Sequence, residues 1–232
     1  MHLTAIIVAA GAGRRVGGAM TKTYLPIAGR PLILRTLDRI FATPAISNII
    51  LVVAASDIEY CRGLLSAESS FNQRPCDLQA GGATRQQSVR CGLEKLQANT
   101  DMVMIHDGAR PFVSPALIER CIHAAVLKEA AVVGVPVRDT IKRVSDEGYI
   151  QSTPERSGLW EIQTPQVFQR GLIVAAYDWA MREGLEATDD AMVVERMGKP
   201  VFVVEGERSN FKITVPEDLQ LAEAMIRAGY FV

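Results

Sequence analysis

Four apolar runs constrain the fold of this chain more than any other feature of its sequence. They cover residues 4–10, 49–54, 102–105 and 130–137, and none of them alternates strictly between apolar and polar residues. A strand that is apolar on both faces must be covered on both faces, as in the parallel sheets of α/β proteins. The runs therefore predict buried strands of a mostly parallel sheet.

Amphipathic helices are predicted between these strands. Four segments have apolar residues at helical spacing, and each opens on residues that favour a helix start: Pro31, Thr84 with Gln87, Ser114 with Pro115, and Thr214 with Glu217. The alternation of buried strands and helices predicts an α/β fold in three layers, with helices on both faces of the sheet.

Residues 138–157 break this alternation. They are polar and contain two short β-like pieces, 140–144 and 149–151, on either side of the turn signal Asp-Glu-Gly at 146–148. An isolated hairpin with so few apolar residues is marginal in water. We predict a protruding β-arm that packs on a second copy of the chain, in preference to a mobile flap, within a single domain spanning residues 1–232.

The first apolar run leads directly into a loop that contains glycines and cations. Gly11 and Gly13 allow a tight turn and a close approach of the backbone to a ligand. Arg14, Arg15 and Lys22 add three positive charges beside exposed amides. This combination favours a triphosphate over a neutral ligand.

Two other kinds of nucleotide-binding glycine loop fit these residues less well. A dinucleotide-binding loop needs a third glycine three residues after Gly13 and a later acid, whereas this chain has Gly17 and Arg30. A Walker-type loop needs glycine directly before the lysine, and Lys22 follows Thr21. The alternative to phosphate binding is a plain turn between strand and helix, whose arginines are solvated.

Further candidate groups lie at predicted strand ends or helix starts. Gly81 and Gly82 precede a helix, where backbone amides can bind a base edge or a phosphate. Asp107 follows the strand 102–105 and should emerge at the carboxyl edge of the sheet, where a carboxylate can hold a hydroxyl or Mg²⁺. Arg110 either serves the same ligand or simply pairs with Asp107.

Three segments in the last third of the chain also contain polar or charged residues that could belong to a site. Lys212 is predicted in a short strand over 209–214, where an inward-facing lysine needs an anion, although a strand lysine usually faces solvent. Thr164-Pro165-Gln166 is predicted as a turn inside a strand-like run. Asp189 and Asp190 follow Thr188 and fit acids in a first helical turn, so no chemistry is assigned to them.

Composition excludes several classes of protein. A formal net charge of −1 argues against a general nucleic-acid binder. The four cysteines form no C-x-x-C pair and are predicted to be buried thiols in a reducing compartment. No signal peptide is recognised before the first strand, and no apolar run is long enough to span a bilayer. We therefore predict a cytoplasmic protein that binds neither nucleic acid nor membrane.

Taken in order, these motifs resemble the 2-C-methyl-D-erythritol 4-phosphate cytidylyltransferase family. The matching residues run from the first strand to the last helix: Ala9-Ala10-Gly11-x-Gly13-x-Arg15, Lys22, Gly81-Gly82-x-Thr84-Arg85, His106-Asp107-x-Ala109-Arg110-Pro111, Asp139-Thr140, Thr164-Pro165-Gln166 and Lys212-x-Thr214. Family members usually have proline before the loop lysine, where this chain has Thr21.

The resemblance implies a nucleotide-diphospho-sugar transferase-like fold, a Rossmann-like architecture. It implies transfer of CMP from CTP to 2-C-methyl-D-erythritol 4-phosphate in non-mevalonate isoprenoid biosynthesis, with Mg²⁺ as cofactor. It also implies a homodimer that interlocks through the β-arm.

By position, the resemblance also implies a set of site residues. Those for the transition state are Arg15, Lys22, Arg156 and Lys212. Those along CTP are Ala9, Ala10, Gly11, Gly13, Gly82, Ala83 and Ser88. Those for the polyol phosphate are Asp107, Arg110, Thr140 and Thr164, with Thr140 and Arg156 reaching in from the partner's arm. Mg²⁺ is expected on the phosphates of CTP, with Asp107 as a further candidate ligand.

Three alternatives stay open at this point. A ribitol 5-phosphate cytidylyltransferase shares the loop and the CTP chemistry, but its motif tends to read Asp-Ala-Val-Arg-Pro where this chain has Asp-Gly-Ala-Arg-Pro at 107–111. An NAD-dependent oxidoreductase is disfavoured by the late glycine and the missing acid. A non-catalytic nucleotide sensor is disfavoured because every candidate cation is present.

Overall fold

The computed structural model describes residues 1–11, 21–68, 71 and 75–230. Gly13, Arg14 and Arg15 lie outside the described residues. Within the described part, seven strands form one sheet in the order β11-β7-β10-β6-β1-β4-β5. The four predicted runs are β1 (Leu3–Val8), β4 (Asn48–Val53), β6 (Met102–Asp107) and β7 (Ala130–Pro136).

The sheet is mostly parallel, as predicted. β1 pairs in parallel with β4 and β6, β4 with β5 (Cys76–Ala80), and β7 with β11 (Phe202–Glu205). β10 (Trp160–Gln169) is antiparallel to both of its neighbours, β6 and β7. The carboxyl ends of β1, β4 and β6 therefore meet at one edge of the sheet.

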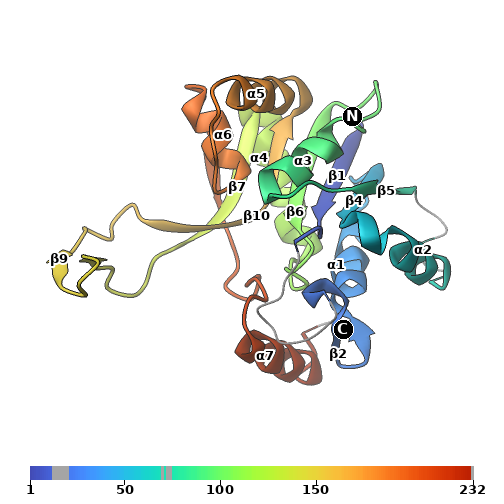
Figure 1. Ribbon diagram of the computed structural model, residues 1–232, viewed down its shortest axis with the longest axis horizontal. Helices are drawn as coiled ribbons and strands as arrows, with labels where there is room; N and C mark the ends of the chain where they lie inside the picture. Colours follow the sequence, from blue (N-terminus) through green and yellow to red (C-terminus); the bar gives the residue numbers. More distant parts are fainter. Residues whose placement is uncertain (12–20, 69–70, 72–74, 231–232) are drawn as a thin grey trace.

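Helices cover both faces of this sheet (Figure 1). The core on one face includes residues of α1 (Leu32–Phe41), α2 (Ile58–Ser66) and α4 (Pro115–Lys128). The core on the other face includes residues of α3 (Arg85–Leu93), α5 (Arg170–Arg182) and α6 (Asp190–Arg196). Along β1, Ala5 and Ile7 belong to the first core and Ile6 to the second. Burial on both faces explains why β1 has no polar alternation.

Two of the predicted helix starts form as the sequence indicated. The Thr84 hydroxyl and the Gln87 side chain make a reciprocal capping box at α3, and Ser114 accepts a hydrogen bond from the Leu117 amide at α4. At α7 (Pro216–Arg227) the predicted box of Thr214 with Glu217 is wrong, because the Asp218 carboxylate accepts from the Thr214 amide and hydroxyl.

The predicted turn at Thr164-Pro165-Gln166 is also wrong. β10 continues through these residues, with a cis peptide bond between Thr164 and Pro165. The pairing of β10 with β7 shifts register between Ile162 and Gln166. A local irregularity in the strand therefore accommodates the proline, and the chain does not reverse there.

The polar segment forms the predicted hairpin. Its strands are β8 (Arg143–Val144) and β9 (Ile150–Ser152), which pair antiparallel and extend well away from the main sheet (Figure 1). The side chains of Tyr149 and Ile150 are 76% and 64% exposed. The hairpin thus presents apolar groups outside the core of its own chain.

The structure bears on the predictions about the cysteines and about membrane-spanning segments. Cys61 and Cys121 are buried, whereas Cys76 and Cys91 are half-buried, so the predicted burial of all four thiols is wrong for two of them. The search of the described residues finds no helix with the length and apolar character needed to cross a membrane.

Candidate active site

A cavity of about 740 Å³ opens at the carboxyl ends of β1 and β6, beside the start of α3. Its lining comes from five separate parts of the chain: Val8, Ala9, Ala10, Gly11, Lys22, Thr23, Gly82, Ala83, Thr84, Arg85, Ser88, Asp107, Ala109, Lys212 and Thr214. Two lysines and one arginine face this volume together with one carboxylate among the described residues. Such a lining is suited to an anionic ligand.

Gly81 and Gly82 form the turn before α3, and close packing requires glycine at both positions. A Cβ on Gly81 would lie 2.5 Å from the Cβ of Ala10, and a Cβ on Gly82 would lie 2.5 Å from the Cβ of Gln87. The Ser88 hydroxyl accepts from the Gly82 amide at 3.2 Å, which holds the turn against α3. Only glycine allows the loop to approach β1 and α3 this closely.

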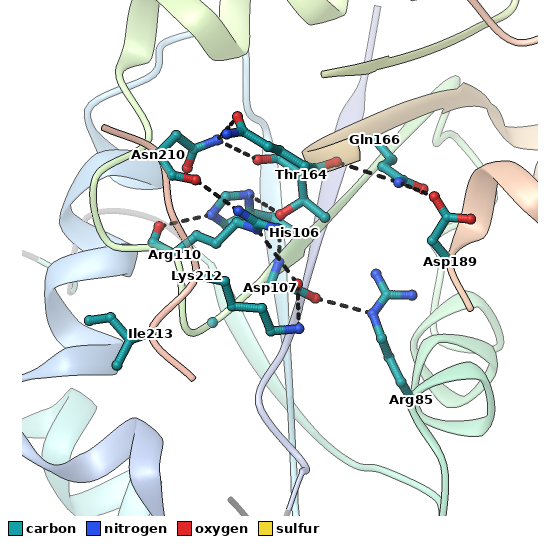
Figure 2. Close-up of polar contacts among 12 residues, drawn as sticks. Arg85, His106, Asp107, Arg110, Thr164, Gln166, Asp189, Asn210, Lys212 and Ile213 are labelled. Atoms are coloured by element: carbon teal, nitrogen blue, oxygen red, sulfur yellow. Dashed lines mark hydrogen bonds and ion pairs between the residues drawn. The ribbon is translucent and has the colours of Figure 1, made fainter. Parts of the chain in front are cut away.

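Asp107 lies at the end of β6 among three cations (Figure 2). Its Oδ1 accepts from Arg85 Nε at 3.1 Å, while its Oδ2 lies 2.8 Å from Lys212 Nζ and 3.7 Å from Arg110 Nε. Burial alone would raise the pKa of Asp107, but Arg85, Lys212 and Arg110 outweigh it and hold that pKa below its usual range. Asp107 is therefore a carboxylate at neutral pH.

Lys212 lies in an irregular segment, so its prediction as a strand residue is wrong. The neighbouring Ile213 amide donates to the Ala109 carbonyl at 2.9 Å, and Arg110 Nη1 donates to the Asn210 carbonyl at 2.8 Å. These bonds fasten the segment to the loop after β6. Lys212 is thereby held over Asp107, and the segment needs no sheet partner.

Lys22 reaches the same cavity from the beginning of the chain. It opens the short helix η2 (Lys22–Tyr24), and its Nζ donates to the Ile213 carbonyl, next to Lys212. Tyr24 is 4% exposed and hydrogen-bonded to Cys61 Sγ at 3.1 Å, and Thr21 donates to Asp57 Oδ2 at 3.3 Å. These contacts anchor the turn at the position where family members usually have proline.

His106 and Thr164 hold Asp107 from behind. The Arg110 carbonyl can only accept, so His106 Nε2 carries the proton in their 3.2 Å hydrogen bond. His106 Nδ1 then accepts from the Thr164 hydroxyl at 2.9 Å, and that hydroxyl in turn accepts from the Asp107 amide at 3.1 Å. Burial lowers the pKa of His106 to about 4, so the ring is neutral at pH 7. Its role is structural, because both ring nitrogens are engaged.

The buried His106 predicts a specific loss of stability in acid. Its pKa of about 4 in the folded protein lies below the unfolded value of about 6.5, so the unfolded chain binds the proton first. Stability contributed by the neutral ring is present above about pH 6.5 and decreases towards pH 4. We expect His106→Gln to remove about 2 kcal/mol of the fall in unfolding free energy between pH 7 and pH 5, measured by urea denaturation.

The exposed His123 provides the matched control for this experiment. His123→Gln should leave the slope between pH 7 and pH 5 unchanged. Asp107 does not interfere, because its lowered pKa removes stability only below about pH 4. An unchanged slope in His106→Gln would contradict the assigned neutral state.

Two residues of this network were not selected from the sequence. Arg85, at the first position of α3, bridges Asp107 and Asp190, and Asp190 is fully buried. Asp189, not Thr188, is the N-cap of α6, since it accepts from the Met192 amide at 3.0 Å. Arg85 belongs to the motif Gly81-Gly82-x-Thr84-Arg85 that carries the family resemblance, but no role was assigned to it. No local pattern separates Asp190 from an ordinary acid in a first helical turn.

The structure brings some of the sequence-selected residues together and leaves others apart. Those that line the cavity are Ala9, Ala10, Gly11, Lys22, Gly82, Ala83, Ser88, Asp107 and Lys212. Arg110 and Thr164 lie behind Asp107 and are outside the lining. Thr140 and Arg156 are exposed on the arm, where Arg156 donates to the Arg138 carbonyl. Gly13 and Arg15 fall outside the described residues.

The donor set limits how a metal can bind here. Among the described residues, no group of three or more His, Cys, Asp or Glu side chains is placed to hold a metal ion. Asp107 is the single carboxylate among the described residues of the lining, and both its oxygens face cations. Mg²⁺ commonly binds through substrate phosphates and water. The site therefore fits a Mg²⁺ that is carried by a polyphosphate.

A mostly parallel sheet with a cation-lined cavity at its carboxyl edge is the arrangement of nucleotide-binding α/β proteins. The solved structures that this chain resembles are those of nucleotidyltransferases. The 4-diphosphocytidyl-2C-methyl-D-erythritol synthase of Anaerococcus prevotii is similar with a TM-score of 0.86 at 33% identity, covering 97% of this chain and 96% of its own. The 2-C-methyl-D-erythritol 4-phosphate cytidylyltransferase of Thermus thermophilus gives a TM-score of 0.80 at 36% identity, covering 98% and 100%.

The sequence comparisons agree with the structural ones. The model of the 2-C-methyl-D-erythritol 4-phosphate cytidylyltransferase family matches residues 3–228. Curated relatives of that name include those of Caldanaerobacter subterraneus, 44% identical over 98% of this chain and 100% of the relative, and of Syntrophotalea carbinolica, 46% identical over 97% of each. This chain belongs to the 2-C-methyl-D-erythritol 4-phosphate cytidylyltransferase family.

Proposed function

We propose that this protein transfers CMP from CTP to 2-C-methyl-D-erythritol 4-phosphate. The products are 4-diphosphocytidyl-2-C-methyl-D-erythritol and pyrophosphate, and the reaction serves isoprenoid precursor synthesis. Beside the family membership, one observation supports this proposal most strongly. Lys22 and Lys212 come from opposite ends of the chain and line one cavity with the glycine turn at Gly82.

The chemistry is an in-line displacement at the α-phosphorus of CTP. A phosphate oxygen of the acceptor forms the new bond to phosphorus, and the bond to the oxygen that bridges to the β-phosphate breaks. Pyrophosphate leaves with that electron pair. A phosphate monoester has a second pKa of about 6, so at neutral pH it is already largely a dianion. The reaction therefore needs no side-chain nucleophile and no strong general base, in keeping with the structural role of His106.

The main barrier is the repulsion between two polyanions. We assign Lys22 to the triphosphate and the departing pyrophosphate, and Lys212 to the acceptor phosphate beside Asp107. Positive charges that are already oriented stabilise such a transition state without reorganisation. The glycine turn at Gly82 and Ala83 offers backbone amides to the nucleotide.

Mg²⁺ is proposed as the cofactor, entering with CTP. Bound to the phosphates, it would neutralise part of their charge as pyrophosphate forms. Lys22 and Lys212 supply the remaining positive charge from the protein. Asp107 is engaged with Arg85 and Lys212, and this favours a metal carried by the nucleotide over one held by side chains.

A direct test compares acceptors and nucleotides in one assay. We expect pyrophosphate release from CTP with 2-C-methyl-D-erythritol 4-phosphate and little with ribitol 5-phosphate. CTP should raise the melting temperature more than ATP or UTP, because a ligand that binds the folded state stabilises it. Preference for ribitol 5-phosphate would reassign the acceptor. Protection by NAD without protection by CTP would overturn the nucleotidyltransferase proposal.

We also propose that the protein is a homodimer joined through the β-arm. Val144, Tyr149 and Ile150 are 52%, 76% and 64% exposed, which is costly for apolar groups unless another surface covers them. Thr140 and Arg156 lie on the same arm, away from the cavity of their own chain. In the proposed dimer, these two side chains serve the partner's active site.

A heterodimer tests whether Arg156 acts in the partner's site. One chain carries Lys22→Ala and the other Arg156→Ala, and the mixed dimer is isolated with two affinity tags. If Arg156 acts in trans, one site is intact and the other has lost both groups, so we expect about half of the wild-type activity per dimer. Near-zero activity would mean that Arg156 serves its own chain, since each site would then lack one group.

A cytoplasmic location is proposed from the cysteines. Cys61, Cys76, Cys91 and Cys121 are all free thiols. The cytoplasm is the compartment in which thiols are kept reduced.

A further inference from the structure

Arg85 links the cavity to a buried carboxylate behind it. Its Nη1 and Nη2 donate to the two oxygens of Asp190 at 3.2 and 2.7 Å, while its Nε donates to Asp107 Oδ1 at 3.1 Å. The Nη1–Nη2 edge of the guanidinium is thus committed to Asp190, and Nε makes the hydrogen bond to Asp107. Figure 2 shows Arg85 and Lys212 approaching Asp107 from different directions.

Asp190 is held in place by neutral donors and by the helix that carries it. The side chain is fully buried and accepts a hydrogen bond from the Tyr177 hydroxyl. Burial and the nearby Asp190 both raise the pKa of Tyr177, so its hydroxyl keeps its proton and remains a donor. The amides of Asp190 and Ala191 donate to Gln166 Oε1 at 3.1 and 3.0 Å, which fixes the start of α6 against β10.

The division of Arg85 between two carboxylates has a consequence for Lys212. An arginine fork binds both oxygens of a carboxylate when it is free to do so. Because Asp190 fixes the orientation of the guanidinium, Arg85 reaches only Oδ1 of Asp107, and Oδ2 is left for Lys212 Nζ at 2.8 Å. Without Asp190, Arg85 could engage both oxygens of Asp107, and Lys212 would lose the partner that orients it in the cavity.

We propose that Asp190 is a positioning residue for the transfer reaction, which it serves by restraining Arg85 so that Asp107 holds Lys212 in the cavity. This inference rests on the proposed function, because it assigns Lys212 to the acceptor phosphate. Asp190 itself contacts no reactant. Its effect reaches the reaction through two ion pairs that share Arg85.

The test is a double-mutant cycle of Asp190→Asn with Lys212→Ala, assayed with both substrates. In the wild-type background we expect Asp190→Asn to raise KM for the acceptor phosphate about tenfold, with a smaller change in KM for CTP, as for a weakened charge-assisted contact. In the Lys212→Ala background the same substitution should change kcat/KM less than twofold, because the group it positions is gone. Asp189→Asn is the matched control, since Asp189 lies one residue earlier and its carboxylate accepts from Gln166 and from the Met192 amide.

A merely structural role would give a different result. In that case Asp190→Asn would lower activity by the same factor in both backgrounds, and this would overturn the inference. An equal rise of KM for the acceptor phosphate and of KM for CTP would also overturn the inference, if circular dichroism shows that the variant is folded at the assay temperature. If Asp190→Asn does not fold, Tyr177→Phe is used, because it removes the hydroxyl that donates to Asp190 and should give a smaller rise of KM for the acceptor, which is likewise lost in the Lys212→Ala background. An inactive wild type would instead refute the proposed function.

Discussion

Replacing Lys22 with alanine is expected to lower kcat by on the order of 100-fold or more. Lys22 lines the cavity, and its Nζ lies against the Ile213 carbonyl beside Lys212. Negative charge on the transferring phosphate and on the departing pyrophosphate increases as the bond breaks, and a positioned ammonium stabilises that charge mainly in the transition state. Loss of such a contact lowers kcat more than it raises KM. Steady-state kinetics with CTP varied at saturating acceptor measure both quantities.

The exposed Lys199 supplies a matched control for this substitution. Lys199→Ala removes the same charge outside the cavity lining and should leave kcat unchanged. The contacts that anchor Tyr24 and Thr21 do not involve the Lys22 side chain, so the turn should stay in place in Lys22→Ala. A kcat close to that of the wild type would refute the assigned role of Lys22.

The central strands were predictable because strands that are buried on both faces consist almost entirely of apolar residues. β1, β4 and β6 are apolar on both faces, since a core lies on each side of them. β5 and β11 form the two edges of the sheet, and their side chains are largely half-buried or exposed. β5 alternates apolar and polar residues, and the apolar run of β11 at 201–204 is only four residues long, so these two strands were not predicted from the sequence.

The candidate site was predictable where it depends on strand ends. Asp107 follows an apolar run, and a parallel sheet places the end of that run at the carboxyl edge. Lys212 was selected correctly as a cavity residue but for the wrong local structure, because hydrogen bonds to Ala109 and Arg110 hold its segment without any strand. Such long-range bonds between loops leave no periodic pattern in a sequence.

Asp190 was missed for a related reason. Two consecutive acids at a helix start are explained locally by capping, and Asp189 does cap α6. The burial of Asp190 depends on the packing of α6 against α5 and α3, which brings Tyr177 and Arg85 to it. Only tertiary structure distinguishes the half-buried cap from the fully buried counter-ion.

That burial predicts a large loss of stability in Asp190→Ala. The substitution leaves Arg85 beside the protein interior without its main counter-ion, and the Arg85 side chain is only 26% exposed. It also removes the acceptor of the Tyr177 hydroxyl. Breaking a buried pair by removing one partner costs about 3–5 kcal/mol, and the contact with Asp107 that Arg85 keeps places the expected loss at the lower end of that range, about 3 kcal/mol. We expect a loss of this size in the unfolding free energy measured by urea denaturation at pH 7.

A half-buried pair with similar geometry separates the effect of burial from that of the ion pair itself. Arg30 donates to both oxygens of Asp38 at 3.0 Å, but the Asp38 side chain is 38% exposed. Because water already reaches Asp38, this pair is less desolvated than the pair with the fully buried Asp190, and Glu68 still accepts from Arg30 at 2.9 Å. Asp38→Ala should therefore cost at most about 1 kcal/mol. Equal losses in the two variants would mean that the stability of the Arg85–Asp190 pair does not depend on its burial.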